Sequence, residues 1–388
     1  MNITNAHASL PPPSAEAADH SDRVRRHIAD RIDAAGGWIG FDRYMDLALY
    51  APGLGYYTAG ARKIGDSLAG GDFVTAPEIS PLFGRALARQ VAEVLAQVTH
   101  GAPGRILEFG AGTGRLARDL LEALAACNVV IDRYEIVEVS ADLRERQRGM
   151  LARWPVAWLD APPRDFEGVI IANEVLDVMP VRLFIKGDAG LLERGVAADA
   201  GAFHFSDRPA DAELVDAARE IETERAPFEA GYASEIGFVA RAWSEGLAGI
   251  LARGAALLID YGFPRREYYH PQRRMGTIMC HYRHHSHADP FWLPGLNDIT
   301  AHVDWTAVAQ AAHESGLDVL GYTAQSRFLL NGGVLDLLAN DHTPAESSAV
   351  QRLLSEAEMG ELFKVLAVGR GVSAPLVGFA RGDRLHTL

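Results

Sequence analysis

One short stretch, residues 106–121, constrains the fold of this chain more than any other. It reads ILEFGAGTGRLARDLL, in which an apolar run with one acid is followed by three glycines at alternate positions and then by a helical pattern. Glycines at such a turn let the backbone bend tightly and approach a ligand without side-chain hindrance. The stretch therefore predicts a ligand-binding turn between a strand and a helix, at Gly110, Gly112 and Gly114.

The spacing of these glycines distinguishes between two adenosine-containing ligands. A dinucleotide-binding turn places its third glycine three residues after the second, which leaves helix N-terminal amides free for a pyrophosphate. Here Gly114 comes two residues after Gly112, and Glu108 stands two residues before Gly110. A carboxylate at that point would repel a pyrophosphate and suits a ligand with a cationic amino group. The turn therefore favours S-adenosyl-L-methionine (SAM), which has an ammonium group and a sulfonium but no phosphate, over NAD.

Short apolar runs alternate with helical stretches from residue 105 onward. Continuous apolar runs are typical of strands that are buried in a parallel sheet. Their alternation with helices predicts an α/β fold with a doubly wound, mostly parallel, seven-stranded sheet. The seven candidate strands are residues 106–109, 134–139, 156–159, 169–172, 255–260, 317–322 and 375–380.

We predict a methyl-donor-binding core over residues 101–388, with two insertions. The first, about 181–250, alternates like a set of antiparallel hairpins. The second, 263–305, is rich in His, Arg, Pro and aromatic residues and shows no periodic element, and it follows a strand end, which makes it the better candidate for substrate contact.

The chain before the core divides into two parts. Residues 1–20 contain no Lys or Arg and match neither a signal nor a transit peptide, so we expect a disordered tail. Residues 21–100 form an expected helical or lid segment. It contains a helix that ends at two glycines near residue 36 and a second helix that begins with Ser80 and Pro81 as N-cap and first residue.

Polar residues at the ends of the other strands extend the predicted cofactor site. Glu138 ends the second strand, where a carboxylate accepts hydrogen bonds from ribose hydroxyls. The third strand ends in Trp158, Leu159 and Asp160, which we expect to cover or hydrogen-bond an adenine ring. Asn173 follows the fourth strand and emerges beside the glycine turn.

Charge and composition narrow the choice of partners. The net charge of −14 argues against broad binding to nucleic acid or anionic membranes. No apolar run reaches the roughly 18 residues of a membrane helix, so we expect no membrane insertion. Two cysteines favour a reduced, cytoplasmic compartment. The histidines of residues 280–287 have no second ligand pair of matching spacing, so we predict no metal site.

Five separated motifs resemble those of one known family. GDFVTAPEIS, LEFGAGTGRLARDLL, ANEVLDVMPV, LLIDYG and DITAHVDW occur in this order within residues 39–379. Together they resemble the MidA family of class I SAM-dependent methyltransferases, which includes a mitochondrial complex I assembly factor that acts on a protein arginine. The resemblance implies a Rossmann-like class I methyltransferase fold, SAM as donor, S-adenosyl-L-homocysteine (SAH) as product and an arginine on a protein as acceptor.

The resemblance also suggests roles for residues outside the turn. It implies that Asp72, Phe73 and Thr75 lie on a segment that folds over the cofactor. An arginine acceptor requires carboxylates that orient the guanidinium, and bidentate pairing supplies that geometry. We predict that Glu174 and Asp177 do this, the two sharing a face if a helical turn starts there.

Three functions remain open at this stage. The leading one is protein arginine methylation, with a respiratory-complex subunit as one implied substrate. The second keeps SAM binding but makes the chain an assembly factor or chaperone, with methylation secondary. The third is an NAD-dependent oxidoreductase, which predicts binding of NADH instead of SAM.

Overall fold

The computed structural model describes residues 10–60, 74–340 and 343–388. The chain divides into two compact units. The sheet unit consists of Val74–Leu176, Arg241–Pro264 and Val303–Leu388. The insertion unit consists of Met1–Phe73, Asp177–Ala240 and Arg265–His302, and so contains most of both predicted insertions.

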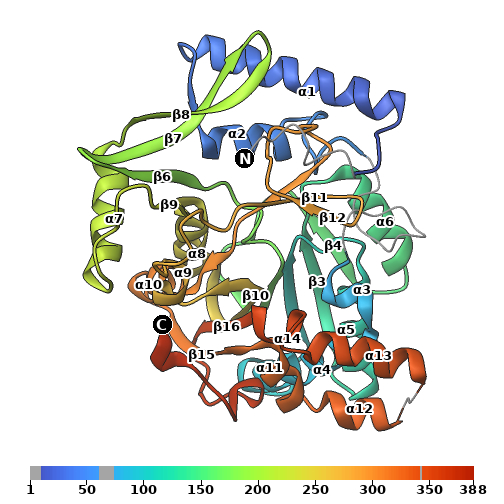
Figure 1. The fold of residues 1–388 in the computed structure, drawn as a ribbon. Coiled ribbons are helices and arrows are strands. Elements are labelled where there is room, and N and C mark those ends of the chain that lie inside the picture. The colour runs from blue at the N-terminus through green and yellow to red at the C-terminus, as the bar shows by residue number, and fades with distance from the viewer. Residues whose placement is uncertain (1–9, 61–73, 341–342) are drawn as a thin grey trace. The chain divides into compact units, whose positions relative to one another are not determined.

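The sheet unit is built on a twisted sheet with eight strands in the described part of the chain (Figure 1). Their order is β15-β16-β10-β5-β2-β3-β4, with β14 beside β10. All neighbours from β10 to β4 are parallel, whereas β16 is antiparallel to both β10 and β15. The strands are β2 (Gly104–Phe109), β3 (Ile131–Val137), β4 (Val156–Leu159), β5 (Phe166–Asn173), β10 (Leu251–Phe263), β14 (Val303–Asp304), β15 (Asp318–Ala324) and β16 (Phe363–Arg370). The predicted mostly parallel sheet is confirmed, with β14 as a short addition.

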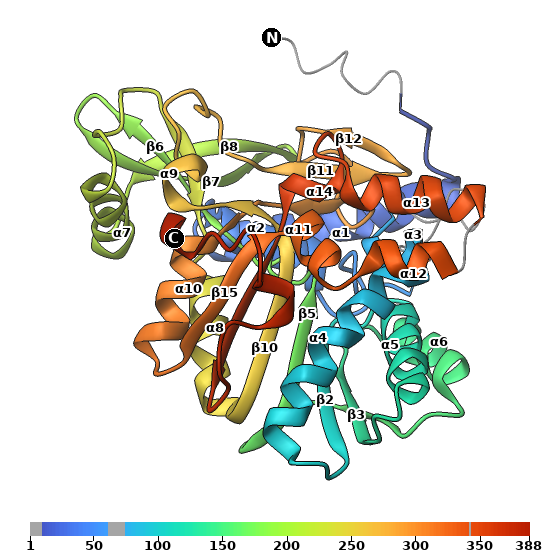
Figure 2. The same cartoon turned by 90° about the horizontal axis from the view of Figure 1, so that it is seen from below.

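Helices cover both faces of this sheet, as a doubly wound fold requires (Figure 2). α4 (Pro81–Thr99) and α5 (Arg115–Ala126) share one apolar core with the central strands. α10 (Trp305–Glu314) lies on the other face, with the end of α8 (Phe238–Ile250). The remaining helices of this unit are α3 (Ala76–Ile79), α6 (Ala141–Leu151), α11 (Gln325–Asn331), α12 (Val334–Asn340), α13 (Pro344–Leu354) and α14 (Met359–Leu362), with the 3-10 helices η2 (Val377–Phe379) and η3 (Leu385–Thr387).

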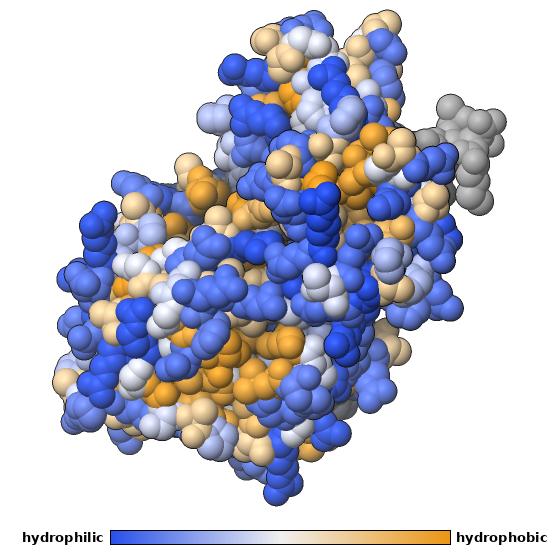
Figure 3. Space-filling view, turned by 90° about the vertical axis from the view of Figure 1, so that its left-hand side faces the viewer, coloured by the Kyte–Doolittle hydropathy of each residue, from blue (hydrophilic) through white to orange (hydrophobic). Residues whose placement is uncertain are grey.

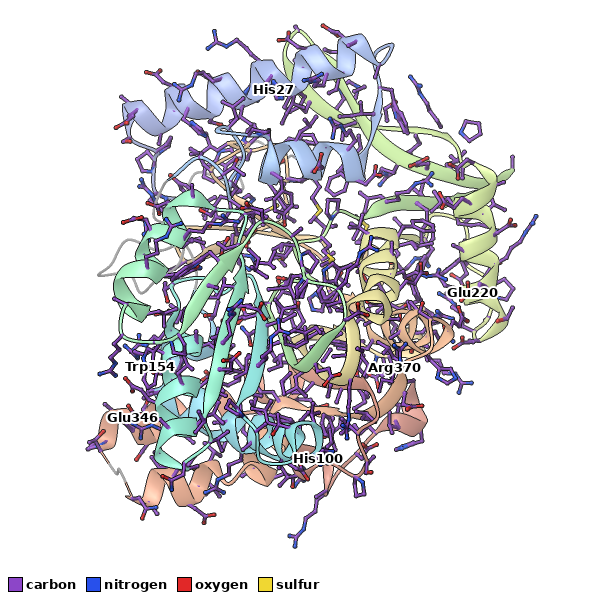
Figure 4. The ribbon with its side chains drawn as sticks, turned by 180° about the vertical axis from the view of Figure 1, so that it is seen from behind. His27, His100, Trp154, Glu220, Glu346 and Arg370 are labelled. Carbon is purple, nitrogen blue, oxygen red and sulfur yellow. The ribbon has the colours of Figure 1, made fainter. Side chains whose placement is uncertain are left out.

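Local sequence explains why α4 begins where it does. Its N-cap is Ser80, whose hydroxyl accepts a hydrogen bond from Leu82 N at 3.1 Å, and Pro81 is its first residue, as predicted. The same hydroxyl donates to Oε2 of Glu346 at 2.7 Å. Glu346, which is labelled in Figure 4, lies in α13. The helix start is therefore held by both its own backbone and a distant side chain.

The last predicted strand, 375–380, is wrong. These residues include η2, and the N–H groups of two of them donate to the side chains of Glu93 and Gln90 in α4 at 2.8 Å each. Because side chains satisfy these donors, the apolar run is buried without joining a ladder. The final strand is instead β16, whose Arg370 donates to the carbonyl of Leu251 in β10 at 3.1 Å (Figure 4).

In the insertion unit the first helix starts earlier than expected. α1 (Ala15–Ala34) follows Ser14, whose side chain accepts a hydrogen bond from the first turn. The disordered tail predicted over 1–20 is therefore wrong for its last residues, because this cap satisfies a free N–H group and alanine favours the helix. The predicted helix end is confirmed: Gly36 and Gly37 follow with φ of 80° and 88°.

Two sheets complete the insertion unit. The larger has the order β1-β7-β6-β9, with β8 paired to β7, and all its pairs are antiparallel, which confirms the predicted hairpins. The smaller, β12-β11-β13, lies in residues expected to form no periodic element, so that expectation is wrong: short strands pair there without apolar alternation. The elements are β1 (Ile39–Gly40), α2 (Phe41–Tyr50), β6 (Arg182–Gly187), β7 (Gly190–Asp199), β8 (Ala202–Pro209), α7 (Ala212–Thr223), β9 (Ala233–Ile236), α9 (Arg265–Tyr268), β11 (Met279–Tyr282), β12 (His285–His287) and β13 (Asp298–Thr300).

The surface drawn in Figure 3 is mostly hydrophilic, with hydrophobic residues gathered in smaller areas. Large hydrophobic side chains that are more than one third exposed are spread over several elements, among them Val139 after β3, Met150 in α6 and Leu335 in α12. Within the described ranges, no helix is both long enough and apolar enough to cross a bilayer.

Candidate functional site

The glycine turn connects β2 to α5 in a conformation that favours glycine. Gly110, Gly112 and Gly114 have φ of 63°, 54° and 86°, all in the left-handed region. A Cβ on Gly110 would lie 3.0 Å from Cγ2 of Val175, and one on Gly114 would lie 3.3 Å from Cγ of Gln147. The tight glycine turn that the sequence predicted is therefore confirmed as a conformation that strains other residues, and it is closely packed at Gly110 and Gly114.

The short helix α3, which lies in the motif GDFVTAPEIS, is fastened to this turn by Glu78, a residue that the sequence analysis did not name. In α3, Oε1 of Glu78 accepts a hydrogen bond from the Thr113 hydroxyl, and Oε2 lies 3.1 Å from NH1 of Arg115. Thr75 is the extended N-cap residue of α3 and makes no side-chain cap bond. The predicted contacts of Asp72 and Phe73 lie outside the described residues. No sequence spacing rule relates Glu78 to a turn 35 residues away.

Glu108 lies within β2 and is buried, with 2% of its surface exposed. The hydroxyl of Tyr134, in β3, donates to its Oε2 at 2.8 Å. Burial raises the pKa of Glu108 to about 8; the bond from Tyr134 opposes the rise, and the charge of Glu138 adds to it. A cation close to this carboxyl would favour its ionised form. That Glu108 serves a ligand ammonium stays a prediction.

Glu138 follows directly after β3, at the carboxyl end predicted for it. Its Oε1 accepts from Ser140 N at 3.0 Å, and its Oε2 accepts from Nε2 of Gln147 at 3.1 Å. Burial raises the pKa of Glu138, and these two bonds oppose the rise. Each carboxylate oxygen can accept more than one bond, so the group can still accept ribose hydroxyls.

The third predicted group lies at the end of β4. Nε1 of Trp158 donates to Oε1 of Gln147 at 2.8 Å, and the carbonyl of Leu159 accepts from NH2 of Arg144 at 3.0 Å. Asp160 is exposed over 94% of its side chain and forms an ion pair with NH1 of Arg144 at 2.8 Å. Trp158 is therefore tied to the site through Gln147, whereas Asp160 is tied to α6 through Arg144. Their contacts with adenine stay predictions.

Glu174 stands at the carboxyl end of β5 with φ of 54°, a left-handed conformation that is uncommon for residues other than glycine. Its backbone N–H donates to the carbonyl of Ile259 in β10 at 2.8 Å. Its Oε1 accepts from Nδ2 of Asn173 at 3.1 Å and from Ala76 N at 3.4 Å. Because Val175 packs on Gly110, this carboxylate lies next to the glycine turn.

Asp177, the second predicted carboxylate, belongs to the insertion unit. It is 5% exposed, and its carbonyl accepts from Ala301 N at 2.9 Å. Residues 174–180 form bends and a turn, so the conditional idea that Glu174 and Asp177 share a helix face is wrong. Pro180 disfavours helical geometry in the residue before it, and the left-handed Glu174 cannot begin a helix.

The histidine-rich segment forms the β11–β12 hairpin. Cys280 pairs with His287 across it and is fully buried. Burial lowers the pKa of His281, and the nearby His287 lowers it further. In the ranges that the structure describes, no three His, Cys, Asp or Glu side chains are grouped so as to hold a metal ion.

The sheet unit provides features that fit SAM. The three glycines of the turn carry no side chain and have a positive φ, which lets a ligand approach the backbone. The Oδ1 atom of Asn173 is buried and has no hydrogen-bond partner among the described residues. A buried acceptor without a partner is suited to a ligand N–H or O–H group. Asn173 would hold the amino-acid end of the cofactor, and Glu138 would hold its ribose. The glycine turn would lie against the cofactor with its backbone.

Comparison with known proteins identifies the family. Residues 86–323 match the model of a family described as "Putative S-adenosyl-L-methionine-dependent methyltransferase". The mouse (Mus musculus) mitochondrial protein arginine methyltransferase NDUFAF7 is 30% identical over 88% of this chain and 83% of that protein. The zebrafish (Danio rerio) protein of the same name is 27% identical over 89% of this chain and 86% of its own length.

A solved structure agrees in fold over almost the whole chain. It is a protein from Burkholderia thailandensis bound to S-adenosyl-homocysteine, with 52% identity and a TM-score of 0.92, covering 98% of this chain and 100% of that one. These findings support SAM, and not NAD, as the cofactor of the Rossmann-like core. The chain is a SAM-dependent methyltransferase and belongs to the MidA-like family of these enzymes.

Proposed function

We propose that the enzyme methylates an arginine side chain of a protein substrate. The observation that carries the proposal is the carboxylate of Glu174, held by Asn173 and Ala76 N at the end of β5 beside the glycine turn. Relatives of this chain are named protein arginine methyltransferases, which supports the same acceptor. A carboxylate is the group that a planar guanidinium pairs with most specifically.

Methyl transfer mainly requires that the acceptor nitrogen and the methyl group of SAM are aligned. When bound, SAM supplies an electrophilic methyl group on its sulfonium. Glu174 would accept N–H bonds of the guanidinium and turn one nitrogen toward that methyl group. As the nitrogen–carbon bond forms, the sulfur–carbon bond breaks with its electron pair going to sulfur, and SAH leaves as a neutral thioether. The attacking nitrogen loses one proton to solvent water, so that the methylated guanidinium keeps a single positive charge. Asp177, three residues further along the chain, is the second carboxylate that we propose for this role.

The test compares Glu174→Gln with a control in the same strand. Glu174→Gln is expected to lower kcat about a hundredfold or more, because a neutral amide orients a cation poorly, while SAH still binds. Glu167→Gln, an exposed position in β5, is expected to leave both unchanged. Both variants would be incubated with labelled SAM and lysate of cells lacking the protein, and labelled peptides sequenced by mass spectrometry. A labelled small molecule with no labelled protein would overturn the arginine assignment.

The assembly-factor function makes a different prediction for the same variant. If SAM binding alone supports the cellular role, Glu174→Gln restores growth or complex assembly in a deletion strain although it transfers no methyl group. If methylation is required, the variant fails to restore it. A respiratory-complex subunit is the substrate we propose to examine first.

We propose the cytoplasm as the location of this enzyme. Cys127 and Cys280 are both free thiols, which is consistent with a reducing compartment. The mitochondrial location in the names of the relatives concerns those proteins. Fractionation of cells that express the tagged chain, with antibodies against marker proteins of each compartment, tests this proposal.

A further inference from the structure

Gln147, in the middle of α6, is a polar residue with no exposed surface, and it contacts three separate parts of the site. Its Nε2 donates to the carbonyl of Gly112 at 2.8 Å and to Oε2 of Glu138 at 3.1 Å. Its Oε1 accepts from Nε1 of Trp158 at 2.8 Å. We propose that Gln147 is a positioning residue for cofactor binding. It holds three groups in one arrangement: the glycine turn, the Glu138 carboxylate that is predicted to bind ribose, and the Trp158 indole that is predicted to lie at the adenine.

The pattern of donors and acceptors allows only one orientation of this amide. Gly112 and Glu138 present acceptors, and the indole of Trp158 presents a donor and no acceptor. If the amide were turned over, its oxygen would face two other oxygens and its NH₂ group would face an N–H. Both amide hydrogens and the amide oxygen are therefore engaged, and Gln147 cannot serve one partner without aligning the other two.

The three partners come from three neighbouring strand ends. Gly112 follows β2, Glu138 follows β3 and Trp158 lies in β4, and these strands are adjacent in the sheet. Ligands of open α/β sheets bind beyond the carboxyl ends of such strands. A side chain that joins all three ends acts on the geometry of the ligand site, and not only on the packing of the helix that carries it.

A second buried glutamine provides the matched comparison. Gln90, in α4, is 1% exposed; its Oε1 accepts from Gly378 N at 2.8 Å and its Nε2 donates to Glu93 at 2.9 Å. It fastens η2 to the core and touches none of the strand ends described above. The loss of either amide removes hydrogen bonds from the interior of the sheet unit, so both losses should lower stability. Only the loss of Gln147 should change cofactor affinity.

The charge of Glu138 gives the proposal a pH signature. Burial raises the pKa of Glu138, and the N–H groups of Ser140, Gln147 and Val139 and the charge of Arg144 oppose the rise. The carboxyl of Glu108 is the other titratable group that interacts with it, and Glu108 is unchanged in the Gln147 variants compared below. Without the Gln147 donor the carboxyl takes up a proton at a higher pH, and a protonated carboxyl accepts ribose hydroxyls less well. In a variant that lacks this donor, affinity should therefore rise with pH as Glu138 ionises.

The experiment measures binding of SAH and of adenosine to the full chain by calorimetry. Gln147→Met keeps the length of the side chain and removes its hydrogen bonds. It should raise the Kd of both ligands about tenfold or more, since the three hydrogen bonds that align Gly112, Glu138 and Trp158 are lost. Gln90→Met should leave both Kd values within about twofold of the parent while lowering the melting temperature similarly. Because adenosine lacks the methionine part, its loss of affinity locates the effect at the adenosine end.

A second variant reverses the pH signature. Gln147→Glu places a carboxyl group beside Glu138, and the pair can share one proton at low pH. As pH rises that proton is lost and the two carboxylates repel each other. Affinity of this variant for SAH should therefore fall with rising pH, opposite in sign to Gln147→Met. If Gln147→Met does not fold, Gln147→Glu tests the inference in its place.

The inference rests on the predicted contact of Glu138 with the ribose, and the two can fail separately. If Glu138→Gln leaves adenosine affinity unchanged, the ribose assignment is wrong. If Glu138→Gln weakens adenosine but Gln147→Met behaves like Gln90→Met, with lower stability and unchanged Kd, Gln147 is a structural residue and the inference is overturned.

Discussion

Buried carboxylates of this protein are held by two kinds of donor, charged and neutral. In the insertion unit, Glu193 receives a bidentate pair of bonds from Arg182, at 2.9 and 2.7 Å. In the sheet unit, Glu138 receives its bonds from a backbone N–H and the neutral amide of Gln147, and Glu108 from the hydroxyl of Tyr134. A carboxylate paired with arginine has its charge neutralised by that partner, whereas one held by neutral donors is left for a cationic or hydroxyl-bearing ligand to bind. Both arrangements occur in each unit, since Arg105 pairs with the buried Glu135 in the sheet unit, and Tyr268 and Thr277 hold the buried Glu235 in the insertion unit. We therefore expect the arginine-paired acids to matter for the fold, and Glu138 and Glu108 to serve a ligand.

The glycine turn should give the largest effect on ligand binding. Gly110→Val places a branched side chain at a φ of 63° and 3.0 Å from Val175, so we expect SAH affinity to fall about a hundredfold. Calorimetry with SAH measures this. Gly101→Val is the control, because Gly101 also has a positive φ, of 94°, but open space around it. Equal loss of SAH affinity in the two variants would show that backbone strain, and not the turn, is responsible.

Glu193, the acid paired with Arg182, should contribute to the free energy of unfolding and not to the affinity for SAH. Arg182→Met leaves Glu193 buried without its partner, which should lower the free energy of unfolding by about 3–5 kcal/mol. Denaturant titration measures it, and SAH affinity of the folded protein should stay the same. Arg194→Met, at a more exposed pair with Asp207, should cost less than about 1 kcal/mol. If Arg182→Met impaired SAH binding, the division between the two kinds of acid would not hold.

Glu108 should behave in the opposite way to the Arg182–Glu193 pair: its ionised form lowers the stability of the fold but favours the binding of SAM. Its pKa is raised from 4.5 to about 8, so its stabilising contribution is complete below pH 4.5 and is lost as pH rises through 8. A bound cation should drive its proton off, so SAM should bind with release of protons near pH 7. Calorimetry in two buffers of different ionisation enthalpy measures that release. Glu108→Gln should abolish it and flatten the fall of stability between pH 5 and pH 8; an unchanged release would show that another group loses the proton.

The smallest effect is expected at Glu78, an acid of the sheet unit that does pair with an arginine. Glu78→Gln keeps a bond to Thr113 but loses the ion pair with Arg115, so SAH Kd should rise only about twofold to fivefold. Fluorescence or calorimetric titration with SAH measures the change. Glu358→Gln breaks the exposed pair with Arg352 and should have no effect on Kd. A loss as large as that of Gly110→Val would mean that Glu78 contacts the cofactor directly.

Some parts of the site depend on residues that are neighbours in sequence, and these parts could be predicted; other parts depend on distant residues and could not. The glycine turn and the position of Glu138 at a strand end depend on neighbours in sequence, so apolar runs and spacing were enough to locate them. Glu78 was missed because its partner Thr113 lies 35 residues away. Gln147 was missed because its partners lie 9, 11 and 35 residues away on three different strand ends, and a glutamine in a helix does not indicate which groups it contacts. The idea of a helical turn after Glu174 was wrong because its left-handed backbone ends the strand in bends.

The sequence alone determined the class of fold and the preference for a methyl donor over NAD, and its five motifs resembled those of the family. The fold class and the preference for a methyl donor follow from periodicity and local spacing, which are properties of neighbouring residues. Only the tertiary structure decided which donor holds each acid, that Asn173 keeps an unbonded oxygen, and that Gln147 joins three strand ends. Hydrogen bonding and burial depend on distances of a few ångströms between residues far apart in the chain, and those distances exist only once the sheet and its helices have packed.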